Sequence, residues 1–339
     1  MRRKQQSDIM LYMAQELIDG FKRRIDYMRI SVTDRCNLRC VYCNTSSKRL
    51  MSHDDILRYE EITRIVAVAS RLGVSRIRLT GGEPMVRPHI DKLVKMLRLV
   101  PGVEELSMTT NAVQLQEYAQ KLKDAGLDRV NISLDTFKPE RFTSLCGVGK
   151  HEDVLNGITA AFRVGLSPVK TNTVVLRGVN DDELVDFARK SVTDAWNVRF
   201  IEEMPLVDNP DGYKLVPIEE IKRSIEDVFG TLEPIQSTFG NGPAKNFRVK
   251  GSHGSIGFIA PVTNCFCQTC NRFRLTADGK LRPCLLRDDE VDLRDALRSG
   301  ASDSELEQLI VAAASNKNEK HQLEQHIAPH GRNMRQIGG

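Results

Sequence analysis

The sequence has no long apolar run and few aromatic residues. Its 339 residues include one Trp, and aromatic residues make up 6% of the chain. No stretch approaches the roughly 20 apolar residues that a transmembrane helix needs. The best apolar stretch near the start, residues 9–14, leads into Glu16 and Asp19 and is too short for a signal peptide. We therefore expect a cytoplasmic protein that does not contact a membrane.

A large charge excess is also missing. The chain has 49 Lys and Arg residues against 45 Asp and Glu residues, so its net charge is only +4. Proteins that bind nucleic acid over a broad surface are usually far more basic. We therefore expect no nucleic-acid partner, although a local basic pocket remains compatible with this balance.

The cysteines lack the even spread of a secreted disulfide framework. Seven of the eight lie in two tight groups, of three and four thiols, and no fourth ligand lies near the first group. This pattern indicates metal ligation in a reducing cytosol. The eight are Cys36, Cys40, Cys43, Cys146, Cys265, Cys267, Cys270 and Cys284.

The first cysteine group is Cys36, Cys40 and Cys43, with C-x₃-C-x₂-C spacing directly after the apolar stretch 28–32. Three thiolates can hold three irons of a cubane cluster and leave the fourth iron open to a small molecule, whereas electron-transfer clusters usually have four cysteines. A zinc knot is the alternative, but zinc needs four ligands and His53 has no partner.

The second cysteine group is Cys267, Cys270 and Cys284, and a predicted hairpin brings its members together. Residues 277–279, Ala-Asp-Gly, form a good three-residue hairpin loop. Thr276 then pairs with Lys280, and the chain after the turn returns Cys284 to its partners.

Strand alternation places Arg272 and Arg274 on the same face as Cys270. Two guanidiniums beside an open metal site suit a phosphate. A zinc ribbon that recruits Cys265 is the alternative; otherwise we interpret Cys265 as a spare thiol, and Cys146 as a buried or loop cysteine.

Short apolar strands alternate with amphipathic helices from residue 28 to about 204, which predicts a parallel sheet, either open or in a full or partial barrel. Chemistry then belongs at the carboxyl ends of the strands, where the first cysteine group and Thr80–Pro84 meet. Expected strands are 28–32, 76–80, 105–109, 129–134, 169–176 and 198–204; expected helices are 60–72, 90–100, 115–125, 154–164, 182–191 and 218–229.

Three segments follow from these patterns. Residues 1–25 form an N-terminal helical extension, because Met10, Met13, Leu17 and Phe21 fall on one helical stripe. Residues 26–204 form the core, and residues 205–339, which repeated prolines interrupt, form a smaller C-terminal domain around the second cysteine group.

Together these motifs resemble the radical S-adenosylmethionine (SAM) enzymes and, within them, the GTP 3′,8-cyclases of molybdenum cofactor biosynthesis. The resemblance covers about residue 17 to the end. The matching stretches are 29–37, 40–43, 76–84, 109–111, 131–135, 199–202, 267–275, 284–285 and 337–339.

This resemblance implies a partial (βα)₆ TIM-type barrel with a C-terminal auxiliary-cluster extension that covers the barrel opening. It implies two [4Fe-4S] clusters, one on each cysteine group, and SAM bound at the first. SAM-site residues carried over from the family are Tyr42, Gly82, Ser133 and Met204.

For GTP, the resemblance assigns binding to six residues. It also implies a catalytic set made of Arg272, Arg274 and a Gly-Gly tail that enters the active site. The GTP residues are Arg29, Arg78, Thr109, Lys170, Arg272 and Arg274, and the tail residues are Gly338 and Gly339.

The implied enzyme is a radical SAM lyase. It cleaves SAM reductively to a 5′-deoxyadenosyl radical, which takes hydrogen from C3′ of GTP and yields (8S)-3′,8-cyclo-7,8-dihydroguanosine 5′-triphosphate, the first step of the pathway. Implied partners are an electron donor such as flavodoxin or ferredoxin and a downstream cyclic pyranopterin monophosphate synthase; a homodimer is left open.

The sequence departs from the family pattern at three places. Asn44–Ser47 replaces a Met-Pro, Cys265 stands where proline is common, and Asn246 stands where an aromatic residue is common. None of these removes a ligand. Two rival hypotheses remain at this point: a peptide-modifying radical SAM enzyme, and a zinc-binding interaction module without catalysis.

Overall fold

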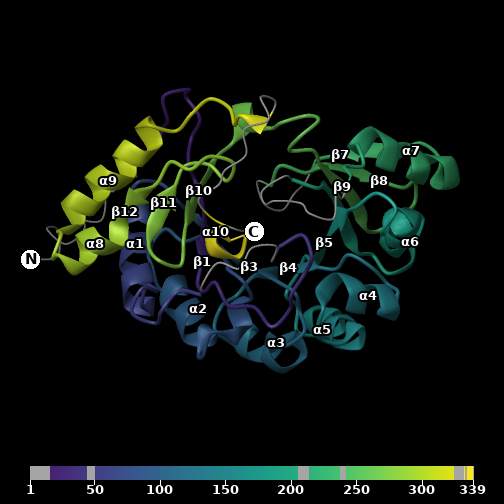
Figure 1. Ribbon diagram of the computed structural model, residues 1–339, viewed down its shortest axis with the longest axis horizontal. Helices are drawn as coiled ribbons and strands as arrows, with labels where there is room; N and C mark the ends of the chain where they lie inside the picture. Colours follow the sequence, from purple (N-terminus) through teal and green to yellow (C-terminus); the bar gives the residue numbers. More distant parts are fainter. Residues whose placement is uncertain are drawn as a thin grey trace, which may run out of the picture.

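The computed structural model describes residues 16–43, 50–204, 214–236, 242–323, 332 and 334–338. Within these residues one sheet of twelve strands has the order β12-β11-β10-β1-β2-β3-β4-β5-β6-β9-β8-β7. The sheet curls into an open ring with the helices mostly outside it (Figure 1). No helix of the described residues is long and apolar enough to cross a membrane.

Six parallel strands form the middle of the sheet, as expected. Each pairs with the next in sequence, and helices on the outside connect them. The strands are β1 (Tyr27–Ser31), β2 (Arg76–Thr80), β3 (Glu105–Thr110), β4 (Arg129–Ser133), β5 (Lys170–Val175) and β6 (Asn197–Glu202); the helices are α1 (Tyr59–Arg71), α2 (Ile90–Arg98), α3 (Leu115–Asp124), α4 (Pro139–Cys146), α5 (His151–Arg163) and α6 (Leu184–Thr193).

Apolar periodicity explains why these segments fold as they do. In α2 the residues Ile90, Leu93, Val94 and Leu97 are fully buried, which is the stripe of an amphipathic helix packed on a sheet. The strands are buried on almost every position, as expected for a parallel sheet with helices outside and side chains inside. The partial barrel that the family resemblance implied is therefore confirmed, and the parallel sheet that the βα repeats predicted is its central part.

The C-terminal segment continues this sheet at both edges. Strand β10 pairs parallel with β1, and β9 pairs parallel with β6, so the parallel run grows by one strand on each side. The further strands are β7 (Glu233–Ile235), β8 (Lys245–Arg248), β9 (Ser255–Ile259), β10 (Arg272–Leu275), β11 (Lys280–Arg282) and β12 (Val291–Asp292).

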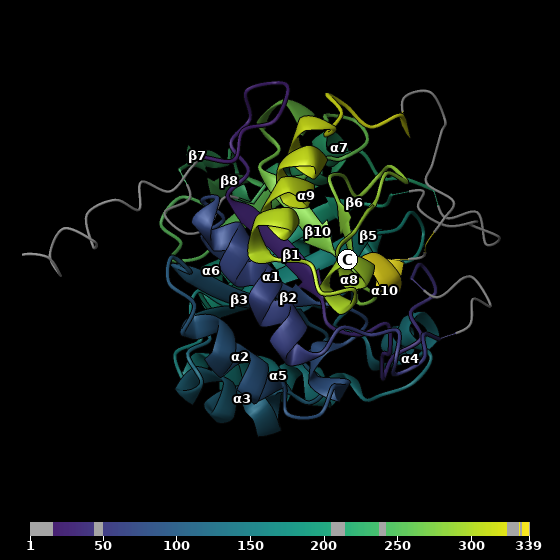
Figure 2. The ribbon, with the colours of Figure 1, turned by 90° about the vertical axis from the view of Figure 1, so that its left-hand side faces the viewer.

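Four helices belong to this segment: α7 (Ile218–Phe229), α8 (Leu293–Arg298), α9 (Asp303–Ser315) and α10 (Met334–Ile337). Helix α9 lies beside α1 (Figure 2), whereas α10 lies in the centre of the ring (Figure 1). The described strands of the C-terminal segment thus extend the central sheet, and Leu286 and Leu323 form a small apolar cluster apart from the main core. The division of the chain at residue 204 stays a prediction.

The hairpin prediction is confirmed. Arg274 lies opposite Arg282, which is the register that pairs Thr276 with Lys280. Gly279 has φ +79°, a left-handed conformation that glycine adopts without a steric penalty. The loop is therefore closed by this glycine, and the guanidinium of Arg332 also pairs with the carboxylate of Asp278 at 2.8 Å.

Two sequence expectations failed. Residues 16–25 form a short turn in which Ile18 bridges to Arg24, not the predicted helix. The buried carboxylate of Asp19 stabilises this turn by accepting bonds from the amides of Phe21 and Arg23. Helix α4 was not predicted, because its eight residues are too few to show a clear period. Residues 1–15 of the expected extension lie outside the described residues.

Candidate functional site

The first cysteine group lies on the loop after β1, and the backbone of the loop after β2 packs directly against it. The amide of Gly82 donates to the carbonyl of Thr33 at 2.7 Å. A Cβ on Gly82 would lie 2.1 Å from the carbonyl oxygen of Arg35, one residue before Cys36. Sequence analysis expected this glycine to admit a ligand; in the structure its missing side chain admits the cysteine loop itself.

Glu83 fastens the same loops to β3. Its buried carboxylate accepts bonds from the Thr110 hydroxyl at 2.9 Å and from the Asn111 amide at 2.7 Å. Burial raises the pKa of Glu83 to about 7. The side-chain amide of Asn111 then reaches Asn37, beside the first cysteine, at 2.8 Å. The glutamate of the Gly-Gly-Glu-Pro stretch is therefore a structural anchor of the site.

Tyr42 reaches across the ring to the end of β4. Its hydroxyl donates to the carboxylate of Asp135, which also accepts the amide of Val174 at 2.8 Å. Burial raises the pKa of Asp135 to about 6. Ser133, another expected SAM residue, is half-buried two residues earlier. These residues and the first cysteine group share the carboxyl ends of the strands.

The thiols of the first cysteine group are poor acids in this setting. Burial, reinforced by Cys40 and Cys36, raises the pKa of Cys43 to about 12. A hydrogen bond with Cys146 and burial raise the pKa of Cys40 well above its usual value. Because buried thiols ionise readily only beside a cation, this group favours a bound metal as its counter-charge.

The second cysteine group surrounds a small cavity of about 70 Å³, which Cys267, Cys270 and Cys284 line together with Arg272 and Arg274. The expected facing of the arginines and thiols is therefore found. Met204, which the family resemblance assigned to SAM, lines this second cavity.

A cation with no expected role, Lys317, supports the second cysteine group together with Arg272. The ammonium of Lys317, only 3% exposed, donates to the carbonyls of Arg272 and Pro283 and so joins the two hairpin strands. Burial would raise the pKa of Cys270, but the charges of Lys317 and Arg272 outweigh it and lower that pKa.

A layer of buried cations lines the interior of the ring. Burial, with the nearby charges of Arg199 and Arg129, lowers the pKa of Lys170 to about 6. Burial also lowers the pKa of Arg78 to about 9 and that of Arg199 to about 10. These groups raise each other's cost of ionisation, so an anion placed among them would be strongly stabilised.

Strand register brings the expected GTP residues into this layer. Arg29 lies between Arg78 on β2 and Arg274 on β10. Strand β10, which follows the second cysteine group, and the central strands therefore line the same barrel interior. The cation layer comprises Arg29, Arg78, Arg129, Lys170, Arg199, Arg272 and Arg274.

Several buried polar atoms near this layer have no hydrogen-bond partner among the described residues. They include the hydroxyl of Thr109, an expected GTP residue, the side-chain amide nitrogen of Asn131 and the side-chain amide oxygen of Asn172. Asn131 lies between Thr109 on β3 and Lys170 on β5. Buried polar groups normally find partners, so their lack of one indicates a place for a polar ligand.

The C-terminal tail enters the ring between the two cysteine groups. The guanidinium of Arg274 donates to the carbonyl of Gly338. Gly338 has φ +73°, and a Cβ there would lie 2.6 Å from a methyl carbon of Thr80. Arg335 lies close enough to Cys43 to lower its pKa. The tail is thus threaded against strand ends as expected; Gly339 and Asn44–Ser47 lie outside the described residues.

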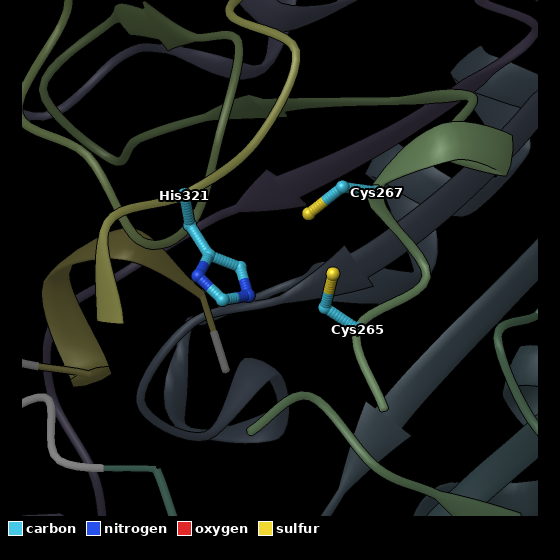
Figure 3. A group of neighbouring side chains, drawn as sticks. All are labelled: Cys265, Cys267 and His321. Atoms are coloured by element: carbon cyan, nitrogen blue, oxygen red, sulfur yellow. The ribbon is translucent and has the colours of Figure 1, made fainter. Parts of the chain in front are cut away.

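The spacing of the thiols tests which metal the groups fit. Ligands of a single zinc ion have Zn–S bonds of about 2.3 Å, so their sulfurs lie about 4 Å apart. Among the described residues, the ligand atoms of neither cysteine group all fall within 4.8 Å of one another. This wider spacing fits thiolates on separate irons of a cluster. The one trio within 4.8 Å is Cys265, Cys267 and His321 (Figure 3).

Sequence reasoning missed the residues whose role depends on distant contacts. Arg129 and Arg199 lie on expected strands. Strand alternation and their positions relative to the other cations on neighbouring strands could have predicted that they point into the barrel. Lys317, His321 and Arg23 gave no such signal, because they lie outside recognisable motifs.

Comparison with known proteins agrees with this geometry. The Radical SAM superfamily profile matches residues 30–190, and the Molybdenum Cofactor Synthesis C profile matches residues 196–323. The GTP 3′,8-cyclase of Moorella thermoacetica is 50% identical over 95% of this chain and 99% of its own length. That of Heliobacterium modesticaldum is 46% identical over 95% of this chain and 100% of its own.

Among solved structures, Streptococcus suis SuiB bound to S-adenosylmethionine is similar in fold. Its TM-score is 0.61 at 14% identity, and the match covers 87% of this chain and 69% of that one. At this identity the likeness concerns the fold alone.

Proposed function

This chain belongs to the GTP 3′,8-cyclase family of the radical SAM superfamily, and from this membership we propose that it converts GTP into (8S)-3′,8-cyclo-7,8-dihydroguanosine 5′-triphosphate. The membership rests on two relatives of that name, which are 50% and 46% identical over 95% of the chain. The proposed reaction is that of a lyase at the start of molybdenum cofactor biosynthesis.

Two [4Fe-4S] clusters are part of the proposal, one on each cysteine group. When bound, the first cluster would supply the reductive cleavage of SAM that starts hydrogen abstraction at C3′ of GTP, and closing the C3′–C8 bond would need a second electron and a proton. Cys36, Cys40 and Cys43 would hold that cluster, and Cys267, Cys270 and Cys284 the other. The chain's own residues position the reactants and exclude water.

The single observation that best supports the nucleotide substrate is the buried cation layer. Lys170, Arg78 and Arg199 are all less than a tenth exposed; the two arginines are positively charged, and a bound anion would favour the charged form of Lys170 as well. Burying like charges together is costly unless an anion joins them. A triphosphate supplies several negative oxygens, which accept charge-assisted bonds from guanidinium and ammonium groups.

The unpartnered atoms of Thr109, Asn131 and Asn172 offer both donors and acceptors for the nucleoside. In this arrangement Arg272 and Arg274 lie between the triphosphate and the second cysteine group. Arg274 also holds the carbonyl of Gly338, so the tail would close over bound GTP.

For SAM, we propose Tyr42, Gly82 and Ser133 as its surroundings, next to the first cysteine group. Gly82 acts by letting the cysteine loop pack closely, and Tyr42 is held in place by Asp135. Met204 lines the second cavity instead, so we assign it to the region where SAM and GTP would meet.

The proposal also implies partners and a compartment. Reduction of the first cluster needs a one-electron donor such as flavodoxin or ferredoxin, and the cyclic product needs a downstream synthase, for which cyclic pyranopterin monophosphate synthase is the expected enzyme. A homodimer is left open. Reduced thiols and clusters favour a reducing cytosol.

A peptide-modifying radical SAM enzyme is the rival that the fold also permits. The decisive test is anaerobic formation of 5′-deoxyadenosine by the iron-reconstituted protein with SAM and reductant, comparing GTP, ATP and no nucleotide. We expect strong stimulation by GTP alone. Cleavage indifferent to nucleotide would leave the superfamily intact and refute the cyclase, and a colourless protein with stoichiometric zinc would favour the binding module.

A further inference from the structure

Beside the second cysteine group, a different set of ligands converges. The thiols of Cys265 and Cys267 and the imidazole of His321 have ligand atoms within 4.8 Å of one another. They point toward one another from two chain segments (Figure 3). Sequence analysis interpreted Cys265 as a spare thiol and gave His321 no role.

We propose that Cys265, Cys267 and His321 bind a thiophilic divalent cation of the zinc class, and that this ion competes with the second cluster for Cys267. Two thiolates and one imidazole, with water in the fourth position, form a common zinc environment. The competition rests on the proposed function, which places a cluster ligand at Cys267; the metal site itself does not.

The chemistry balances without any other reactant. Both thiols lose their protons to solvent on binding, and the neutral imidazole supplies a lone pair. One ring nitrogen of His321 lies 3.0 Å from the carbonyl oxygen of Pro261, and the other accepts the Leu323 amide at 3.3 Å. An ion on Nδ1 would replace the Leu323 amide and leave the Nε2 proton bonded to the Pro261 carbonyl, which would orient the ring. An ion on Nε2 would replace the Pro261 contact and place the ring proton on Nδ1.

The protein holds the two segments together before any metal arrives. The buried guanidinium of Arg23 donates to the carbonyl of Cys267 at 2.7 Å, to that of Asn318 at 2.7 Å and to that of Glu319 at 2.8 Å. Asp19 fixes the same guanidinium at 2.6 Å. The loop with Cys267 and the segment leading to His321 therefore share one clamp.

A second clamp fixes the approach to Cys265. The buried carboxylate of Glu202 accepts bonds from the amides of Val262 at 3.2 Å and Thr263 at 3.0 Å. The backbone on both sides of the ligands is therefore held by hydrogen bonds. A metal ion then binds without the entropy cost of ordering the chain.

An entry path also exists. Cys265 lines an outer cavity of about 370 Å³ with Thr263, Phe266 and Gln268, whereas Cys267 and His321 line the inner cavity of the second cysteine group. The trio lies between the two cavities, so an ion arriving from outside meets Cys265 first and takes Cys267 next.

The direct test uses the full chain with serine at the five other cluster positions, so that its thiols are Cys146, Cys265 and Cys267. Anaerobic zinc titration against a chelator should show one equivalent bound. Cys265→Ser or His321→Gln should each weaken binding more than about tenfold, since even supporting residues change metal affinity by ~10–100-fold. Cys146→Ser is the matched control and should change nothing. No bound zinc, or binding indifferent to Cys265→Ser, would overturn the site.

A second test keeps all cluster ligands. Apo protein is exposed to zinc before iron and sulfide are added, and bound iron and zinc are then counted for the unaltered chain and for Cys265→Ser. Zinc at the first cysteine group would affect both proteins alike. We expect zinc to cost the unaltered chain one more cluster's iron than it costs Cys265→Ser. Equal iron in the two would refute the competition. Neither test uses GTP or SAM, so a failure of the cyclase proposal would be seen separately.

Discussion

The first and second cysteine groups offer the same number of thiols, but their surroundings differ in charge. Around the first, burial and neighbouring thiols raise the pKa of Cys43 to about 12, and this rise prevails over the opposing charge of Arg335. Around the second, burial would raise the pKa of Cys270, yet Lys317 and Arg272 lower it. Cysteine count and spacing hide this difference, because the cations come from distant parts of the chain.

The difference bears on what each site would do when loaded. Net charge and hydrogen bonds near the sulfurs set the reduction potential of an iron–sulfur cluster. Among the residues that the structure describes, the first site has the weaker cationic influence, which favours a more strongly reducing cluster and suits electron donation to SAM. A site beside Lys317 and Arg272 favours a less reducing cluster and an anionic ligand, which suits a nucleotide.

The largest expected effect comes from a substitution that disturbs the backbone packing of the first cysteine group and leaves the second unchanged. Gly82→Ala would place a Cβ 2.1 Å from the Arg35 carbonyl oxygen, which cannot move without the loop of the first cysteine group. We expect a loss of about 3 kcal/mol in unfolding free energy and loss of the first cluster alone, so that iron content halves. Gly20→Ala is the control, because its Cβ would meet only an ordinary contact at 3.5 Å. Full iron content in Gly82→Ala would contradict the packing argument.

The next effect concerns the cations between the two groups. Lys170→Met should weaken GTP binding by about 10–100-fold, the worth of one charge-assisted bond, while both clusters remain. Because a pKa of about 6 leaves Lys170 mostly uncharged at neutral pH without GTP, and the methionine leaves no large cavity, stability without GTP should not fall. Calorimetry of GTP binding and thermal unfolding of the same samples measure both quantities; a joint fall would mean that Lys170 is structural.

The same lysine predicts a pH dependence. Burial and nearby arginines lower its folded-state pKa to about 6, below the unfolded value near 10.4. Between these values the unfolded chain binds more protons, so the stability of the GTP-free protein should rise with pH over that window. GTP favours the charged form, so its affinity should fall as pH rises from 6 to 8. Lys170→Met should lose both slopes, and unchanged slopes would refute the assignment.

A smaller effect tests the charge contrast itself. Lys317→Met should lower the reduction potential of the second cluster by on the order of 100 mV, the Coulomb effect of one charge a few ångströms away at an effective dielectric constant near 20. The first cluster should not change. Lys317→Arg keeps the charge and should restore most of the potential, which distinguishes electrostatics from the loss of its two carbonyl bonds. Redox titration followed by electron paramagnetic resonance reports both clusters.

The smallest effect compares the extra thiol beside each group. Cys146 is buried and hydrogen-bonded to Cys40, so Cys146→Ala should cost about 1 kcal/mol of unfolding free energy while both clusters still assemble. Cys265 is half-buried, and Cys265→Ser should change stability by less than about 0.5 kcal/mol. Denaturant unfolding of the apo proteins measures the change in unfolding free energy of both variants. Loss of the first cluster in Cys146→Ala would show that the Cys146 thiol is a ligand.

Local patterns in the sequence determined much of this protein. Cysteine spacing marked both groups, apolar periodicity predicted the six central strands, and Ala277–Gly279 set the hairpin register that the structure confirms. Each of these depends on residues close together in the chain, where helix and strand periods and turn geometry act directly.

Only the tertiary structure decided which distant groups meet. It placed β9 and β10 at opposite edges of the barrel sheet, gathered Arg129 and Arg199 with the expected cations, and brought Lys317 and His321 to the second cysteine group. The physical reason is that electrostatic and metal-binding properties depend on distances in space. A local pattern fixes how each segment folds, whereas strand pairing and packing fix which charges and ligands become neighbours.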